Sequence, residues 1–248
     1  MAKKNLNVIL ISRSQDKLSN VSDEIASKYK VETRTIQADF TRNDIYEKIG
    51  KEIKDLDIGV LVNNVGMTYD YPKDFTKVSE KHLHDLINCN IMSATMMSKI
   101  VLEGMQRRER GLIINMSSIV HLFPSPYLLV YASLKQFLVS FSKGLAEETK
   151  ANNVTVQCVI PGIVTTKFSG VRNTNLLITT PESYATTSNF FTNFVHESIV
   201  INFTSNFLRN YKLKAIKRIN KMAAKQKNVQ EKVTEINEVS ETATSPHV

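Results

Sequence analysis

The sequence predicts an α/β fold with a doubly wound parallel sheet. Short runs of apolar, mostly β-branched residues recur along the chain and alternate with stretches of helical periodicity. This alternation is typical of strand–helix–strand units, whose parallel strands are buried on both faces. In addition, Arg13 and Ser118 follow two of these runs closely. Because open α/β sheets bind ligands at the carboxyl ends of their strands, both residues are expected at a functional edge.

The chain of 248 residues is long enough for one domain of this kind. Five strands are expected, over residues 7–12, 31–37, 59–63, 112–116 and 154–160. Apolar spacing predicts helices between them, over 14–28, 41–54, 79–107 and 128–150. Ser14 is expected to cap the first helix, and Thr41 or Asn43 to open the second. The stripes expected to face the core are Leu18, Val21 and Ile25 in the first helix and Ile45, Ile49 and Ile53 in the second.

The composition is that of a soluble globular protein, with 42% apolar and 23% charged residues. Cys89 and Cys158 lie in apolar elements and are interpreted as buried thiols in a reducing compartment rather than as a disulfide. The five histidines lack the spacing of metal ligands, so no metal site is expected. No apolar run reaches the ~20 residues of a membrane-spanning helix.

The net charge of +8 is concentrated in one segment. Residues 209–232 contain nine Lys and Arg and one Glu, whereas the remainder contains 23 basic and 23 acidic residues. A nucleic-acid-binding surface on the domain is therefore not expected. The pattern predicts a domain over 1–205, a basic amphipathic helix over 206–232 of the kind that lies on anionic membranes, and a disordered polar tail over 233–248.

The residues that suggest chemistry follow the fourth expected strand. Ser118 lies at its end, Tyr131 comes thirteen positions later, and Lys135 four positions after that. On a helix, Tyr131 and Lys135 share one face, one turn apart. The lysine ammonium favours the phenolate and lowers the pKa of the tyrosine, whose hydroxyl can give a proton to a carbonyl oxygen while hydride reaches the carbon. Ser118 can donate a hydrogen bond to the same oxygen.

The tyrosine–lysine spacing alone is not specific. It recurs at Tyr69 and Lys73, where Pro72 intervenes and no strand ending in serine precedes it, so this copy is interpreted as a loop. Taken alone, Tyr131 and Lys135 would also fit an ordinary exposed helix face. The combination of strand, serine, tyrosine and lysine is what favours a catalytic site.

Several further motifs occur in a fixed order, and they are Ile11-Ser12-Arg13-Ser14, Gln37-Ala38-Asp39-Phe40-Thr41, Gly59-Val60-Leu61-Val62-Asn63-Asn64-Val65-Gly66-Met67, Asn90 and Pro161-Gly162. With Ser118, Tyr131 and Lys135, they make the chain resemble the short-chain dehydrogenase/reductase superfamily over roughly residues 2–190. It is most similar to the 17-beta-hydroxysteroid dehydrogenases of the type 3 and type 12 group, which includes very-long-chain 3-oxoacyl-CoA reductases. The resemblance implies a Rossmann-like fold, NADP(H) as the cofactor and a homodimer.

The resemblance implies a catalytic set of four residues, Asn90, Ser118, Tyr131 and Lys135. Asn90 matches the asparagine that kinks the long helix and holds a water in the proton relay to the lysine. Lys135 would also hold the nicotinamide ribose, and Tyr131 lies beside it in the cofactor site.

Other residues match the cofactor-binding positions of the family. Asp39 matches an adenine-contacting aspartate, although without the resemblance it is a helix-capping candidate. Asn64 and Gly66 match the Asn-Asn-Ala-Gly turn, with valine in place of alanine, and Val164 and Thr166 match contacts to the nicotinamide amide. Glycine there fits a close backbone approach to the cofactor.

Arg13 is singled out by its place after a strand end rather than by the resemblance alone. It would pair with a 2′-phosphate and favour NADP over NAD, an interpretation about as well supported as an ordinary surface arginine.

The glycine-rich turn of the family, Thr-Gly-x-x-x-Gly-x-Gly, does not occur in this sequence. Residues 2–7 resemble the end of the first helix, so the sheet is expected to lack its first, central strand. The strands ending at Ser12 and Asn63 would then lack the neighbour that joins them. We expect a truncated gene model, a splice form or a fragment, without the family's amino-terminal membrane anchor.

The leading hypothesis is NADPH-dependent reduction of a keto group on a lipid, either a 17-ketosteroid or a long-chain 3-oxoacyl-CoA, at the cytosolic face of the endoplasmic reticulum membrane. The alternative is a catalytically inactive, truncated homologue with a membrane-surface or partner-binding role. Residues 167–205 are rich in large apolar groups, which suits a lipid substrate and fits ordinary packing equally well.

Overall fold

The computed structural model describes residues 1–122, 124–164 and 178–179. The chain divides into two compact units. The first comprises residues 1–67, 79–118 and 134–160, and the second comprises 68–78, 119–133 and the residues from 161 onward. Thr166 and the segments 206–232 and 233–248 lie outside the described residues.

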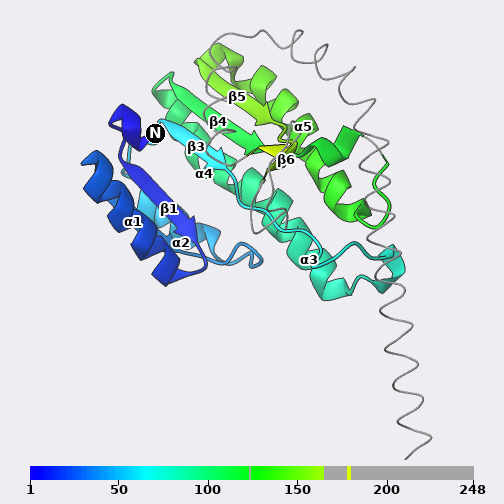
Figure 1. The fold of residues 1–248 in the computed structure, drawn as a ribbon. Helices are drawn as coiled ribbons and strands as arrows, with labels where there is room; N and C mark the ends of the chain where they lie inside the picture. Colours follow the sequence, from blue (N-terminus) through cyan, green and yellow to red (C-terminus); the bar gives the residue numbers. More distant parts are fainter. Residues whose placement is uncertain (123, 165–177, 180–248) are drawn as a thin grey trace, which may run out of the picture. The chain divides into compact units, whose positions relative to one another are not determined.

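The strands of the first unit form two parallel sheets (Figure 1). β1 (Val8–Ser12) pairs with β2 (Thr33–Gln37), and β3 (Val60–Asn63), β4 (Gly111–Met116) and β5 (Val154–Val159) follow one another in the second sheet. All the expected strands are present within two residues of their predicted bounds. Within the described part of the chain β1 and β3 are not paired with each other, as predicted for a sheet without its central strand.

The helices also follow the prediction, with two differences at the residue level. Their bounds are Gln15–Tyr29 for α1, Tyr46–Ile53 for α2, Glu80–Ile87 for α3, Ser93–Arg107 for α4 and Leu129–Thr149 for α5. In α1 only Leu18 of the expected stripe is buried, whereas Val21 is 43% exposed. α2 begins later than predicted because residues 41–44 form a turn instead of its first helical turn.

The long helix expected over 79–107 is interrupted. Its cap is as expected for such a start, because the Ser79 hydroxyl accepts a hydrogen bond from the His82 N–H at 3.3 Å. Between α3 and α4, however, the π-helical segment η3 (Asn88–Met92) intervenes. The helix predicted over 79–107 is therefore not a regular α-helix throughout, and the irregular part contains Asn90, where the resemblance implied a kink.

Short elements complete the description. Single 3₁₀ turns occupy Ala2–Lys4 (η1), Phe75–Lys77 (η2), Ile119–Leu122 (η4) and Lys150–Asn152 (η5). In the second unit, β6 (Ile163–Val164) pairs in parallel with β7 (Ile178–Thr179).

One hydrophobic core serves both sheets of the first unit. Ile36 of β2 and Ile113 of β4 are almost fully buried in the same cluster as Ile49 of α2 and Met105 of α4. Truncating any of these side chains to alanine would cost about 2–5 kcal/mol. Since the cluster draws on both sheets, α2 and α4 hold them together although their strands are not paired.

Candidate active site

Three predicted site residues, Gly66, Asn90 and Lys135, lie close together in the first unit. A Cβ atom at position 66 would lie 3.0 Å from Oδ1 of Asn90 and 3.4 Å from Nζ of Lys135. Any side chain at this position would press on both groups, so glycine is what allows the backbone to pass so close to them. Two of the predicted catalytic residues and one predicted cofactor-binding residue therefore lie at one place in the first unit.

Lys135 is held at the end of β4 by both its main chain and its side chain. Its ammonium group donates to the carbonyl of Met116 at 3.0 Å, and the Ser117 hydroxyl donates to the Lys135 carbonyl at 2.7 Å. The side chain is only 4% exposed. Burial disfavours the charged form and lowers the pKa of Lys135 to about 8, although the nearby thiols of Cys89 and Cys158 act in the opposite direction. The lysine can thus change its charge close to neutral pH.

Asn90 lies inside the π-helical segment and is 1% exposed. Its amide nitrogen donates to the carbonyls of Met67 and Leu86, both at 2.9 Å. Its Oδ1 is buried and accepts no hydrogen bond from any described residue. Since buried acceptors rarely lack a donor, a water or ligand donor is expected at this atom, beside Lys135.

Hydroxyl groups stabilise the π-helical segment. The Ser93 N–H bonds back to the Asn88 carbonyl, five residues earlier, which is the wide turn of a π-helix. The hydroxyls of Ser93 and Thr95 then donate to the carbonyls of Cys89 and Ile91, at 2.7 and 2.6 Å. Both bonds run from a hydroxyl to the carbonyl four residues earlier and add side-chain contacts to the irregular turn.

A buried amide network lies beside these residues and joins β3, β4, α4 and α5. Asn63 donates to the side chains of Asn115 and Ser98 at 2.8 and 3.1 Å, and Asn115 donates to Ser142 at 2.8 Å. Asn63 and Asn115 are register partners in neighbouring strands. Asn115 is fully buried, so its exchange for an apolar residue would remove two hydrogen bonds from the interior of the network, although Asn63 would keep its bond to Ser98 and Ser142 its bond to the Leu138 carbonyl.

Ser118 and Tyr131 lie where the sequence predicted them, the first directly after a strand and the second on a helix. Ser118 follows β4 and is partly buried. Tyr131 lies near the start of α5, in the second unit, and is 7% exposed. Because Tyr131 and Lys135 are both buried, their interpretation as an ordinary exposed helix face is wrong.

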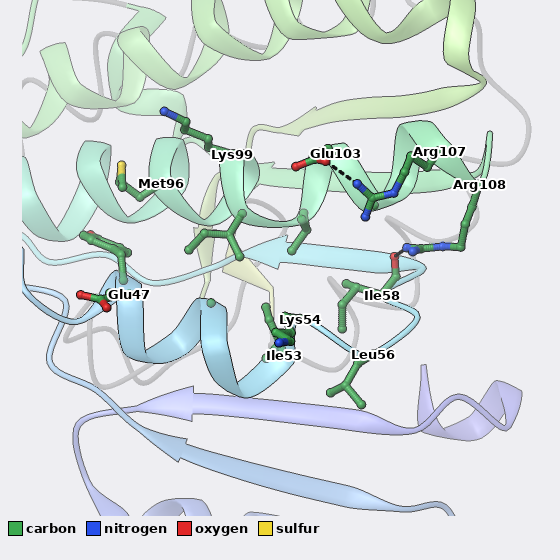
Figure 2. A pocket seen from close by; sticks show the side chains of 15 residues that line it. Glu47, Ile53, Lys54, Leu56, Ile58, Met96, Lys99, Glu103, Arg107 and Arg108 are labelled. Atoms are coloured by element: carbon green, nitrogen blue, oxygen red, sulfur yellow. Dashed lines mark hydrogen bonds and ion pairs between the residues drawn. The ribbon is translucent and has the colours of Figure 1, made fainter.

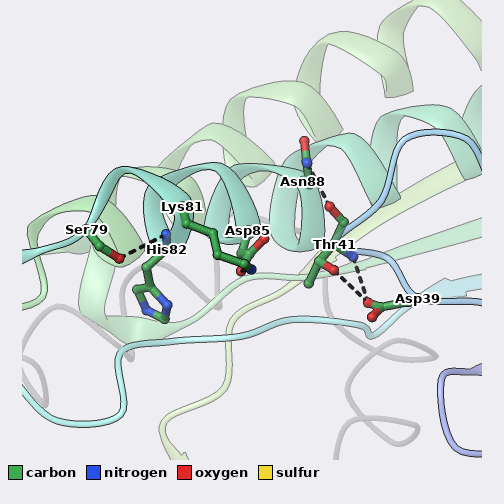
Figure 3. A network of polar contacts seen from close by, with 7 residues as sticks. All are labelled: Asp39, Thr41, Ser79, Lys81, His82, Asp85 and Asn88. Atoms are coloured by element: carbon green, nitrogen blue, oxygen red, sulfur yellow. Dashed lines mark hydrogen bonds and ion pairs between the residues drawn. The ribbon is translucent and has the colours of Figure 1, made fainter.

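Arg13 and Asp39 follow β1 and β2, the two strands of one sheet. Oδ1 of Asp39 accepts from the backbone N–H of Thr41 at 3.0 Å and from its hydroxyl at 2.9 Å (Figure 3). The Thr41 N–H is the largest cause that holds the pKa of Asp39 below its usual value, and the charge of Arg13 contributes. The helix-capping interpretation of Asp39 is wrong in detail, because Asp39 opens a turn that ends at Arg42, whereas α2 begins only at Tyr46.

Asn64 and Val164 are the remaining predicted cofactor-binding residues within the described part of the chain. Asn64 is exposed in the loop after β3, where its N–H bonds to the Val62 carbonyl at 3.0 Å. Val164 lies on β6 in the second unit.

Tyr69 has a structural role that the sequence did not predict. It lies in a loop, as expected for the second tyrosine–lysine copy, and is 5% exposed. Its hydroxyl accepts a hydrogen bond from the N–H of Val130 at 3.3 Å, at the start of α5. Nothing near Tyr69 in the sequence could have indicated a partner 61 residues away.

A cavity of about 600 Å³ opens elsewhere, between α2 and α4 (Figure 2). Ile53 and Lys54 line it on one side, and Met96 and Lys99 on the other. None of the predicted catalytic or cofactor residues within the described part of the chain lines this cavity. Within the described ranges, no group of His, Cys, Asp and Glu is arranged to hold a metal ion, and no helix is long and apolar enough to cross a membrane.

Comparison with known proteins shows the family to which the chain belongs. A family model described as short chain dehydrogenase matches residues 1–176. The very-long-chain 3-oxoacyl-CoA reductase of Macaca fascicularis is 47% identical over 186 residues, and that of Homo sapiens is 45% identical over 186 residues. In both cases the match covers 74% of this chain and 60% of the relative, so the chain spans about 60% of the length of these relatives.

Solved structures show the same fold. A short-chain dehydrogenase from Sphingobium yanoikuyae in complex with NADPH superimposes with a TM-score of 0.73 at 20% identity, covering 85% of this chain and 87% of that one. ElxO with NADP bound superimposes with a TM-score of 0.60 at 29% identity, covering 68% of each chain.

Proposed function

The chain belongs to the short-chain dehydrogenase family, and we propose that its site serves the NADPH-dependent reduction of a keto group on a lipid. The observation that carries the proposal is the convergence of Gly66, Asn90 and Lys135, with a buried lysine whose pKa is about 8 and an acceptor without a partner beside it. Such perturbed groups are characteristic of sites that move protons.

In the proposed reaction Tyr131 gives its hydroxyl proton to the carbonyl oxygen of the substrate. Lys135, four residues later on α5, stabilises the phenolate that remains. Ser118 donates a hydrogen bond to the same carbonyl oxygen and orients it. The proton of Tyr131 is replaced through Lys135 and a water held at Oδ1 of Asn90.

The residues present fit the nicotinamide cofactor at some positions. NADPH would supply the hydride that reduces the carbonyl carbon. Its nicotinamide ribose would lie beside Lys135, with Val164 and Thr166 at the nicotinamide amide. Asp39 uses Oδ1 within its own turn, and its Oδ2 would contact the adenosine. The exposed Arg13 would bind the 2′-phosphate.

For the substrate we favour a long-chain 3-oxoacyl-CoA over a 17-ketosteroid, because the relatives at 45–47% identity are named very-long-chain 3-oxoacyl-CoA reductases. We extend the proposal to a homodimer at the cytosolic face of the endoplasmic reticulum membrane. Contact of residues 206–232 with that membrane is part of the proposal and rests on their basic, amphipathic sequence.

The proposal is tested with a chimera that carries the amino-terminal segment of the Macaca fascicularis relative, ending where the match begins, in front of this chain. We expect the purified chimera to oxidise NADPH when a long-chain 3-oxoacyl-CoA is added. Tyr131→Phe should lower kcat by about 10²–10⁴-fold. The matched control is Tyr71→Phe, which removes the hydroxyl of a tyrosine that is 46% exposed and should leave kcat unchanged. Near-full turnover by Tyr131→Phe would disprove the assignment.

A catalytically inactive homologue is the second candidate. It is favoured by the separation of the β1–β2 sheet from the β3–β4–β5 sheet and by the missing glycine-rich turn in these 248 residues. A folded chimera that binds NADPH but reduces neither class of ketone would support this candidate over the reductase.

A further inference from the structure

A side-chain amide outside the predicted catalytic set ties the π-helical segment to the rest of the first unit. Asn88, the first residue of that segment, donates from Nδ2 to the backbone carbonyl of Thr41 at 2.8 Å (Figure 3). The two residues are 47 positions apart, so the contact joins separate parts of the fold. The proposed reaction assigns no role to Asn88.

This contact has a counterpart two residues further along the segment. Asn90 donates to the carbonyl of Met67, in the loop after β3, whereas Asn88 donates to the loop after β2. The segment η3 is therefore held by an amide at each of two positions, to two different loops. A wide π turn is less regular than the α-helix on either side, and such side-chain contacts select one register for it.

The loop that receives Asn88 is itself ordered by a carboxylate. Oδ1 of Asp39 accepts both the N–H and the hydroxyl of Thr41, at 3.0 and 2.9 Å. The carbonyl of that same Thr41 is the acceptor for Asn88. A continuous set of three hydrogen bonds thus runs from Asp39 through Thr41 to the segment that contains Asn90.

We propose that Asn88 is a positioning residue, which fixes the register of the π-helical segment and thereby places the Asn90 side chain beside Lys135 and Gly66. Asp39 contributes to the same placement through the Thr41 turn, in addition to any contact it makes with a ligand. The consequence for catalysis rests on the proposed function, whereas the placement of Asn90 is a property of the folded chain.

The placement is tested on the 248-residue protein without substrate or cofactor. In protein labelled with ¹⁵N at asparagine, the side-chain amide of Asn90 gives its own pair of NMR signals, identified by their loss in Asn90→Ser. In Asn88→Ala we expect these signals to shift and to exchange with water about fivefold faster or more, as the loss of one hydrogen bond implies. The side-chain signals of Asn115, which is buried against Ser142, should not change.

Gln106→Ala is the matched control, because Gln106 also tethers this helix by a side-chain amide, at 3.1 Å from Asn152, but at its far end. It should leave the Asn90 signals in place. Asp39→Ala provides a second route, since it releases Thr41 without altering the helix, and should move the Asn90 signals in the same direction. Unchanged Asn90 signals in both Asn88→Ala and Asp39→Ala would overturn the proposal, and so would an equal change in Gln106→Ala. An inactive chimera would contradict the proposed function without affecting this result.

Discussion

Lys135 combines a charged side chain with deep burial, and these two properties oppose each other energetically. A lysine that is 4% exposed loses most of its hydration, and its ammonium group donates to the Met116 carbonyl in place of water. The lowered pKa of about 8 is the result of that burial. The fold therefore keeps this lysine at a cost, which is understandable if its charge is used.

This conflict predicts an unusual dependence of stability on pH. Below pH 8 Lys135 is charged in both the folded and unfolded states, and the folded state bears the full cost of burying the charge. Between pH 8 and the ordinary value of 10.5 the unfolded chain binds more protons than the folded one, so this group makes stability rise with pH. The gain should approach roughly 3 kcal/mol at most.

Lys135→Met isolates this contribution, because methionine fills a similar space without titrating. We expect Lys135→Met to be more stable than the parent at pH 7, and its advantage to shrink steadily between pH 8 and 10.5. Urea unfolding of both proteins across this range measures the difference. An advantage that stays constant with pH would show that the lysine titrates as it does in water.

Arg13 provides a prediction on cofactor choice. In the chimera, Arg13→Ala should weaken NADPH binding by about tenfold or more and leave NADH nearly unaffected, because only NADPH offers the 2′-phosphate for a charge-assisted bond. Arg34→Ala is the control, since Arg34 is an exposed arginine of the neighbouring strand β2. Equal weakening of both cofactors would mean that Arg13 does not contact the phosphate.

Among single residues, those with a characteristic spacing along the chain could be identified from the sequence. Residues whose partners lie far away in the sequence were missed. Tyr131 and Lys135 could be found because four positions on a helix define one face. Burial, which distinguishes them from a surface pair, could not be read from the spacing. Tyr69 and Asn115 were not predicted, because their partners, Val130 and Ser142, lie far away in the sequence.

Among the elements, the π-helical segment is the one that apolar periodicity could not predict. The apolar pattern from 79 to 107 fits one long helix, and inserting one residue in a single turn changes that pattern little. What distinguishes the centre is its polar content, since Asn88, Asn90 and Ser93 all satisfy backbone carbonyls there. A kink at Asn90 was expected from the family resemblance alone, and the structure gives it a physical form.

The amide network that joins two strands to two helices leads to a prediction on stability. Asn115→Ala removes the bonds to Asn63 and Ser142 at a fully buried position and creates a small cavity, so unfolding should become easier by about 2–3 kcal/mol. Asn7→Ala is the control, because Asn7 also makes two bonds, to Glu32, but at the surface. Its effect should stay below about 1 kcal/mol, and urea unfolding distinguishes the two. Equal losses would mean that burial does not set the cost.

For the whole molecule, the sequence predicted the division of the sheet correctly. The strands ending at Ser12 and Asn63 lie in different sheets, as expected from the missing glycine-rich turn and central strand. The sequence did not show what would join the two sheets. The side chains that do so, such as Ile49 and Met105, come from helices whose packing partners a one-dimensional pattern does not specify.

The absence of a glycine-rich turn from these 248 residues leads to a prediction on cofactor affinity. In this family the pyrophosphate is bound by backbone N–H groups of the glycine-rich turn and by the helix that follows it, and these 248 residues contain no such turn. Each hydrogen bond to a charged group contributes about 1.5–3 kcal/mol, so the loss of three should raise the Kd for NADPH by more than about a thousandfold. The 248-residue protein should therefore bind NADPH far more weakly than the chimera, although Asn90, Ser118, Tyr131 and Lys135 are all present. Nicotinamide fluorescence titration of both soluble proteins, with circular dichroism to establish that each is folded, measures the difference. Micromolar binding by the 248-residue protein would mean that other residues of this chain replace the turn, and Arg13 and Gly66 would then be the first to examine by substitution.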